Sequence, residues 1–222
     1  MPALKPSPPE HLPGAVASPL RLESVVRAMI GGLLGLLIWA TPATPTAAAE
    51  LLYVEVKKKD DRYFIASAVH YDARIENVYR ILIDYDNFKQ ISSMFKESRY
   101  IERNDDGSGV VFTLTEGCLV FFCQTIERTE YLEVKPVSRI VATAIPEQSN
   151  MKFSRAIWEL SEDETGTHMR YSLEMEPDFW VPPLLGRLAM KWVLKRGGQR
   201  AAERIEQLAT ENDSSLPGSN AK

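Results

Sequence analysis

Hydrophobic and polar positions divide the chain into a β-rich middle and a helical end. From residue 51 to residue 176, apolar and polar side chains alternate in short stretches separated by turn residues, as in strands with one buried face. From residue 182 to residue 209, apolar positions recur every three or four residues, which is typical of an amphipathic helix. We therefore expect a sheet and a long helix that bury each other's apolar faces.

The β-rich part is predicted to begin with a hairpin of strands 51–57 and 62–70. Two short helices should follow, one carrying the periodic apolar positions 75–82 with Asp72 as its N-terminal cap, and one around residues 86–95. Further strands are predicted at 99–103, 110–116, 121–128, 131–134, 139–145, 152–160 and 167–176. Their spacing of about 8–12 residues is typical of a single antiparallel meander.

The first 49 residues differ in composition from the rest. Arg21 and Arg27 precede an apolar run from Ala28 to Ala40, and the segment ends in Ala47-Ala48-Ala49, so we predict a signal peptide cleaved near Glu50. An uncleaved anchor is the alternative, although the run is shorter than the ~20 residues of a spanning helix. Both alternatives place the domain, predicted at 50–209, in the periplasm or another extracytoplasmic space. Residues 210–222 are predicted to be a disordered tail.

Composition limits the kind of protein that the chain can be. With 45% apolar and 25% charged residues, it resembles an ordinary globular domain. Its net charge of −4 lacks the dominant positive field of a nucleic-acid-binding protein, so no nucleic-acid partner is expected.

Two strings in the sequence indicate a family. VYRILIDYDNFKQISSMFKESRYIER resembles a segment of the START-like (SRPBCC) polyketide cyclase and coenzyme Q-binding proteins, and PPLLGRLAMKWVLKRGGQRAAERIEQLA resembles their C-terminal helix. The resemblance covers residues 62–209. It implies an α+β helix-grip fold, in which a curved antiparallel sheet wraps around the long helix and encloses an elongated apolar cavity. It does not specify a function, because this fold supports transport, binding and cyclisation.

Candidate ligand-binding residues follow from the two faces that should meet. The helical stripe includes Leu185, Leu188, Trp192 and Arg196, and Arg196 is either a polar group inside the cavity or a side chain that turns outward. The last strand should present Tyr171, Leu173 and Met175 to the helix, with Phe112, Leu114 and Trp158 from other strands. That these side chains line a cavity, rather than form a solid core, is implied by the resemblance. Gly197-Gly198 indicates either close helix–sheet approach or a bend.

The segment GCLVFFCQ leaves two interpretations open. In one, Cys118 and Cys123 flank a hairpin turn and form a disulfide, which exposes Leu119, Val120, Phe121 and Phe122 for contact with a membrane or for covering the cavity mouth. In the other, a strand continues through the segment and buries the cysteines on opposite faces. Trp180 and the basic residues 187–200 of the helix would add a second membrane contact.

Little in the sequence indicates catalysis. After the N-terminal segment the chain contains only His70 and His168, both expected at the surface, and it shows no metal-ligand spacing. No catalytic residue, metal or cofactor is therefore predicted. We expect an exported carrier that binds a lipid or an isoprenoid quinone and does not transform it. A polyketide cyclase or aromatase on the same fold is the alternative, and a partner-binding module is a third.

Overall fold

The computed structural model of the chain describes residues 49–119, 122–181 and 187–214. They form eight strands, two α-helices and two short 3-10 helices. In chain order the elements are β1 (Glu50–Lys59), β2 (Arg62–Tyr71), α2 (Ile75–Ile83), η1 (Tyr85–Gln90), β3 (Phe95–Arg103), β4 (Gly109–Leu119), β5 (Phe122–Lys135), β6 (Arg139–Ala144), η2 (Pro146–Gln148), β7 (Met151–Asp163), β8 (Gly166–Pro177) and α3 (Arg187–Ser214).

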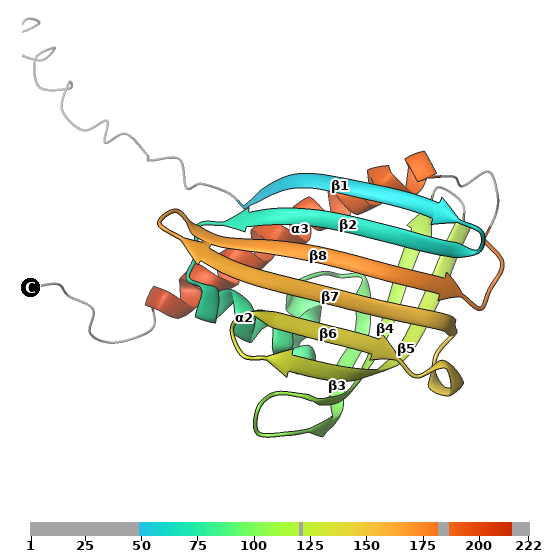
Figure 1. The fold of residues 1–222 in the computed structure, drawn as a ribbon, viewed down its shortest axis with the longest axis horizontal. Helices are drawn as coiled ribbons and strands as arrows, with labels where there is room; N and C mark the ends of the chain where they lie inside the picture. The colour runs from blue at the N-terminus through green and yellow to red at the C-terminus, as the bar shows by residue number, and fades with distance from the viewer. Residues whose placement is uncertain (1–48, 120–121, 182–186, 215–222) are drawn as a thin grey trace, which may run out of the picture. The chain divides into compact units, whose positions relative to one another are not determined.

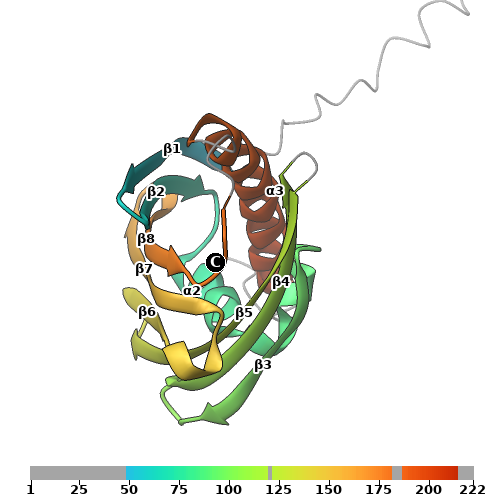
Figure 2. The ribbon, with the colours of Figure 1, turned by 90° about the vertical axis from the view of Figure 1, so that its right-hand side faces the viewer.

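The strands form one antiparallel sheet in the order β1-β2-β8-β7-β6-β5-β4-β3. The sheet is strongly curved, and α3 lies along its concave side, as Figures 1 and 2 show. Viewed from its end, the helix closes the gap between β1 and β4 (Figure 2). This arrangement confirms the predicted helix-grip fold.

Several predicted boundaries differ from the structure. The helix predicted around residues 86–95 is the 3-10 helix η1, and β3 already begins at Phe95. The strands predicted at 121–128 and 131–134 are one continuous strand, β5, because the polar pair Thr129-Glu130 is not a turn but a buried part of the sheet. The helix α3 continues to Ser214, five residues past the predicted end. Asp72 does not cap α2 with its side chain. The cap position is Arg74, and the backbone N–H of Asp72 donates instead to Glu206 Oε2 at 2.7 Å.

Part of the hydrophobic core lies where α2 meets the C-terminal half of α3. Val78 of α2 is fully buried, and Ala202, Ile205 and Ala209 of α3 belong to the same cluster. Small alanine side chains allow the two helices to approach closely. The side chain of Asn77 donates to the Ala209 carbonyl at 3.1 Å, so a polar contact also joins the two helices.

Candidate functional site

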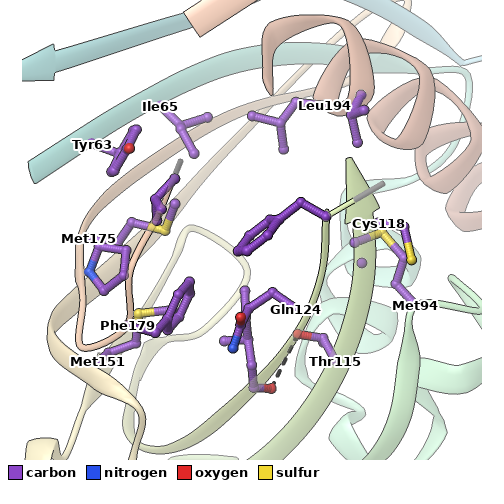
Figure 3. Close-up of a pocket in the computed structure, with 16 residues that line it drawn as sticks. Tyr63, Ile65, Met94, Thr115, Cys118, Gln124, Met151, Met175, Phe179 and Leu194 are labelled. Atoms are coloured by element: carbon purple, nitrogen blue, oxygen red, sulfur yellow. Dashed lines mark hydrogen bonds between the residues drawn. The ribbon is translucent and has the colours of Figure 1, made fainter. Parts of the chain in front are cut away.

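A cavity of about 170 Å³ lies between the sheet and the N-terminal half of α3. Its walls are formed mainly by apolar side chains: Ile65 of β2, Met151 of β7, Met175 of β8, Phe179, and Val193 and Leu194 of α3. Figure 3 shows these elements surrounding the cavity, with Thr115 and Gln124 among the polar groups of its wall. We call this space the mouth cavity, because the segment before α3 and the β4–β5 hairpin border it. Its composition suits an apolar guest.

The β4–β5 hairpin carries a disulfide at its tip. Cys118 and Cys123 are directly opposite each other in the strand register and are joined by an S–S bond. The interpretation in which a single strand buries them on opposite faces is therefore wrong, because β4 ends and β5 begins between them. Phe122 lines the mouth cavity, and its ring lies against that of Trp180 with 6.4 Å between the centroids. Two aromatic side chains from distant parts of the chain thus meet at the mouth.

A second cavity of about 210 Å³ lies further along α3, toward the packed end. Its wall includes Trp158 and Tyr171, whose rings are 5.1 Å apart, and Met169. On the helix side it meets Gly198, Ala201, Ala202 and Ile205. A Cβ atom added to Gly198 would touch only Leu51, at 3.7 Å, so this glycine leaves open space rather than a tight contact with the sheet.

The inner face of β5 carries a buried polar cluster that the sequence analysis missed. Arg128 and Glu130 of β5 form an ion pair at 3.6 Å, with exposed side-chain fractions of 19% and 2%. Arg128 is two residues from Ile126, which lines the mouth cavity on the same face of β5. Tyr171, from the second cavity, interacts electrostatically with both charges. The cluster thus adjoins both apolar spaces.

Several atoms of this cluster have no hydrogen-bond partner within the described part of the chain. They are Arg128 Nε, Glu130 Oε1 and the hydroxyl of Thr113. Thr113 is directly opposite Arg128 in the β4–β5 register. An unsatisfied buried polar atom costs about 1–3 kcal/mol, and each such group in a native interior calls for an explanation. A polar group of a bound molecule would satisfy donors and acceptors together.

The surroundings of the cluster keep its tyrosines neutral and its arginine charged. Burial raises the pKa of Tyr171 to about 12, against the opposing effect of Arg128. Burial also raises the pKa of Tyr85 well above its ordinary value, and Glu130 adds to the rise. Burial lowers the pKa of Arg128, but the Glu130 carboxylate together with Tyr171 and Tyr85 outweighs burial, so the pKa is raised. Near neutral pH, the cluster therefore offers phenol hydroxyls and one guanidinium.

The structure brings some predicted binding residues to the cavities. Met175 lines the mouth cavity, and Trp158 and Tyr171 line the second one. Leu173 is half-buried and packs against the core cluster between those neighbours on β8, and it also borders a pocket shared with Phe64 and Arg155. Phe122 and Trp180 lie at the mouth, and the Trp180 side chain is 71% exposed.

The predicted role of Phe112 and Leu114 is wrong. On β4 the fully buried residues are Val111 and Thr113, and Thr115 lines the mouth cavity, so the odd-numbered positions face inward. Phe112 faces the other way, where the Arg99 guanidinium lies over its ring at 4.7 Å from the centroid. Because side chains alternate along a strand, an error of one residue moves each one to the opposite face.

The predicted position of Trp192 in the cavity wall is also wrong, because its side chain is 59% exposed. Arg196 takes the outward alternative: it is exposed, with its guanidinium 4.6 Å from the centre of the Trp192 ring. Val193 and Leu194 face the cavity in their place. Gln199 lies one turn further along α3. Its amide accepts from Leu51 N–H at 3.2 Å and donates to the Ala49 carbonyl at 2.8 Å, and so ties the helix to β1.

Five predicted contacts lie outside the described residues or their described side chains. They are Leu119, Val120, Phe121, Leu185 and Leu188. The predicted signal peptide, apart from Ala49, and residues 215–222 of the predicted tail also lie outside the described part.

A signal for the missed cluster is present in the sequence. Gln124, Ile126, Arg128, Glu130 and Leu132 occupy every second position of β5 and therefore share one face. Leu132 is buried, which would have placed the two charged residues on the inner face once β5 was recognised as one strand. The break assumed at Thr129-Glu130 concealed this alternation.

The chain matches a known protein family over most of its described length. A family model described as polyketide cyclase / dehydrase and lipid transport matches residues 65–210. No curated protein matches the chain.

Solved structures with the same architecture include proteins of different kinds. A START superfamily protein from Mycobacterium smegmatis is 17% identical, with a TM-score of 0.53, and the match covers 65% of this chain and 98% of that one. The Zhui aromatase/cyclase from Streptomyces sp. R1128 is 13% identical, with a TM-score of 0.54 over 71% and 99% of the two chains. Human STARD10 is 14% identical, with a TM-score of 0.57 over 77% and 78%. At these identities the likeness shows a shared fold.

Proposed function

The chain belongs to the polyketide cyclase / dehydrase and lipid transport family, whose fold binds hydrophobic ligands, and on this premise we propose that it is an exported carrier of one lipid or isoprenoid quinone. The observation that carries the proposal is the mouth cavity with its apolar wall, together with the unsatisfied polar atoms of Arg128 and Glu130, which lie two and four residues along β5 from Ile126 of that wall. The apolar part of the ligand occupies the cavity, and its polar end meets these atoms.

Affinity and orientation have separate sources in this arrangement. Removing apolar surface from water contributes roughly 25 cal/mol per Å², so the hydrocarbon part of the ligand supplies most of the binding free energy. Arg128 Nε and the hydroxyl of Thr113 are donors, while Glu130 Oε1 is an acceptor. A ligand with a carbonyl or hydroxyl end should therefore bind more tightly than a plain hydrocarbon.

A direct test is mass spectrometry of an organic extract from the purified protein, together with uptake of a fluorescent lipid. A stoichiometric lipid or quinone in the extract supports the proposal. Thr115→Phe fills the mouth cavity and should lower uptake at least tenfold. Thr125→Phe is the matched control, because Thr125 lies on the adjacent strand and is exposed. Equal uptake by the two variants, both folded by circular dichroism, would refute the cavity as the binding site.

The polar end is tested by a double substitution. Arg128→Met on its own leaves Glu130 buried without its partner and should lower the free energy of unfolding by about 3–5 kcal/mol. Arg128→Met with Glu130→Leu removes both charges, so the fold is retained while the preference for carbonyl- or hydroxyl-ended ligands over hydrocarbons is lost. Arg155→Met, at an exposed position of β7, is the control. An unchanged preference in the double variant would place the polar end elsewhere.

Transient membrane contact is part of the proposal. The exposed face of α3 beside the mouth carries Lys191, Trp192, Lys195 and Arg196, and Trp180 is exposed nearby. Each basic side chain near an anionic membrane contributes on the order of 1 kcal/mol. Among the described residues, no helix is long and apolar enough to cross a membrane.

Charge reversal distinguishes docking from ligand binding. Lys191→Glu with Lys195→Glu should slow lipid transfer from anionic vesicles at least tenfold and leave uptake from detergent solution unchanged. The control is Lys135→Glu with Arg139→Glu, an exposed pair at the β5–β6 turn. Trp192→Ala should likewise affect only transfer from vesicles, because its ring lies outside the cavity. Equal transfer rates for the two double variants would contradict docking through α3.

Export is supported by the disulfide, because disulfides persist mainly in oxidising compartments. Ala49 is buried, and its carbonyl accepts a hydrogen bond from Gln199. We therefore expect the mature chain to retain Ala49, with cleavage just before it rather than at Glu50. N-terminal sequencing of the exported protein checks this. Protein found only in the cytoplasm with its full N-terminus would refute export.

A cyclase or aromatase is the second candidate function. Arg128 and Glu130 beside the neutral hydroxyls of Tyr85 and Tyr171 could move protons on a bound polyketone. No charged side chain or histidine lines either cavity itself among the described residues. A poly-β-ketone analogue converted by the wild type but not by Arg128→Met with Glu130→Leu would favour the enzyme, whereas recovery of unaltered ligand favours the carrier.

A further inference from the structure

Two histidines and a carboxylate meet on the outer face of the sheet, away from both cavities. His70 of β2 and His168 of β8 are directly opposite in the strand register, and their ring centroids are 4.7 Å apart. Asp163, at the end of β7, places Oδ2 2.7 Å from His168 Nε2. One ligand atom from each of the three residues lies within 4.8 Å of the others. The hairpin β7–β8 and the pairing of β2 with β8 create this cluster from residues far apart in sequence.

We propose that His70, His168 and Asp163 bind one transition-metal ion of the Zn²⁺ type. Imidazole nitrogens and a carboxylate oxygen are ligands that Zn²⁺ prefers, at about 2.0–2.2 Å. Tetrahedral ligands at that bond length lie about 3.3 Å apart, so small side-chain rotations convert the observed spacing into a coordination site. Three protein ligands leave a fourth position for water or an external ligand.

The surroundings of Asp163 fit this role. Thr165 donates to the other carboxylate oxygen, Oδ1, from its backbone N–H at 2.8 Å and from its hydroxyl at 2.6 Å. Oδ2 is thereby held toward His168, as supporting hydrogen bonds commonly orient a carboxylate ligand. The hydroxyl of Thr165 also lies 3.1 Å from His70 Nε2. The turn carries the successive acids Glu162, Asp163 and Glu164, which favour a cation.

The site is separate from the ligand cavities. His168 lies on the opposite face of β8 from Met169 and Tyr171, and seven residues along the strand, about 24 Å, separate it from Met175 at the mouth cavity. A metal ion there would join β2 to the β7–β8 turn at the end of the sheet where α2 and the C-terminal end of α3 lie (Figure 1). Metal binding and lipid binding can therefore succeed or fail independently.

Isothermal titration of the untagged full chain with Zn²⁺ tests the site, and visible absorption of the Co²⁺ form reports its geometry. We expect one equivalent of Zn²⁺ to bind, an intense Co²⁺ band typical of four-coordination, and a higher Tm with metal. His70→Ala and His168→Ala should each lower the affinity at least tenfold, and Thr165→Val about tenfold. Glu133→Gln, at an exposed position of β5 away from the cluster, is the control and should bind as the wild type does.

Two results would overturn the proposal. One is the absence of Zn²⁺ and Co²⁺ binding by the wild type. The other is binding that survives in the variant carrying both His70→Ala and His168→Ala. Because these side chains are on the outer face, the variants should keep the wild-type circular dichroism spectrum. Lipid uptake by the same variants should be unchanged, which separates this site from the carrier function.

Discussion

The two halves of α3 face the same curved sheet but leave different interiors. In the C-terminal half, Ala202, Ile205 and Ala209 pack into the core with α2, and Glu206 and Asn77 add hydrogen bonds to backbone groups. In the N-terminal half, Val193 and Leu194 border the mouth cavity, and the opposite wall consists of flexible or aromatic side chains such as Met151, Met175 and Phe179.

The difference shows how one helix both holds the fold together and leaves space. Small alanines and specific hydrogen bonds bring the C-terminal half into close contact, so that half can anchor the helix. Methionine side chains fill irregular gaps and rearrange at little cost, so the mouth half can adapt to guests of different shape. Stability should therefore depend mainly on the packed half, and ligand binding on the mouth half.

Truncation of one apolar side chain in each half gives the largest expected effect. Ile205→Ala should lower the free energy of unfolding by about 2–4 kcal/mol, because the side chain is 5% exposed and belongs to the core cluster, although it also borders the second cavity. Leu194→Ala should cost less than about 1 kcal/mol, because its side chain is only partly buried and borders the mouth cavity. Urea denaturation measures both values. Equal losses would mean that the mouth half is packed as well as the other.

Removal of the disulfide should have a smaller effect, confined to the mouth. Cys118→Ser with Cys123→Ser should lower the free energy of unfolding by at most about 2 kcal/mol, because the closed loop is short. The tip should then hold Phe122 less firmly, and a bound fluorescent lipid should leave faster. Stopped-flow measurement compares the rate of lipid release from the variant and from the reduced wild type with the rate from the oxidised wild type. Equal rates in all three would show that the disulfide does not influence the mouth.

The smallest expected effect is a pH dependence of the packed half. Burial raises the pKa of Glu206 above its ordinary value of 4.5, although the hydrogen bond from Asp72 N–H opposes the rise. The folded state therefore favours the protonated form, and this contribution to stability is complete below pH 4.5 and lost as the pH rises through the folded pKa.

Glu206→Gln removes that titration and keeps an oxygen acceptor for Asp72. Its free energy of unfolding relative to the wild type should therefore increase between pH 4 and pH 7, when both are measured by urea denaturation at each pH. Glu211→Gln, at an exposed position of the same helix, is the control. A difference between Glu206→Gln and wild type that stays constant over this range would contradict the assignment.

The amino-acid pattern by itself determined the fold. Alternation along the strands, the 3.6-residue period of the last helix and the turn residues between elements are local properties, and they predicted the hairpin, the meander and the long helix in the right order. The spacing of Cys118 and Cys123 also allowed the disulfide, although it left a continuous strand as an alternative.

Only the tertiary structure decided which faces meet. Val111 and Phe112 are both apolar, so composition could not tell which set of β4 residues lies inside, and the pairing with β5 placed Thr113 and Thr115 there. On α3, successive side chains point about 100° apart, so Trp192 and Val193 cannot both face the mouth cavity. In the structure, Val193 faces the cavity and Trp192 faces solvent. Burial of Arg128 and Glu130 depends on long-range pairing, because a charged residue shows no local preference for the interior of a sheet.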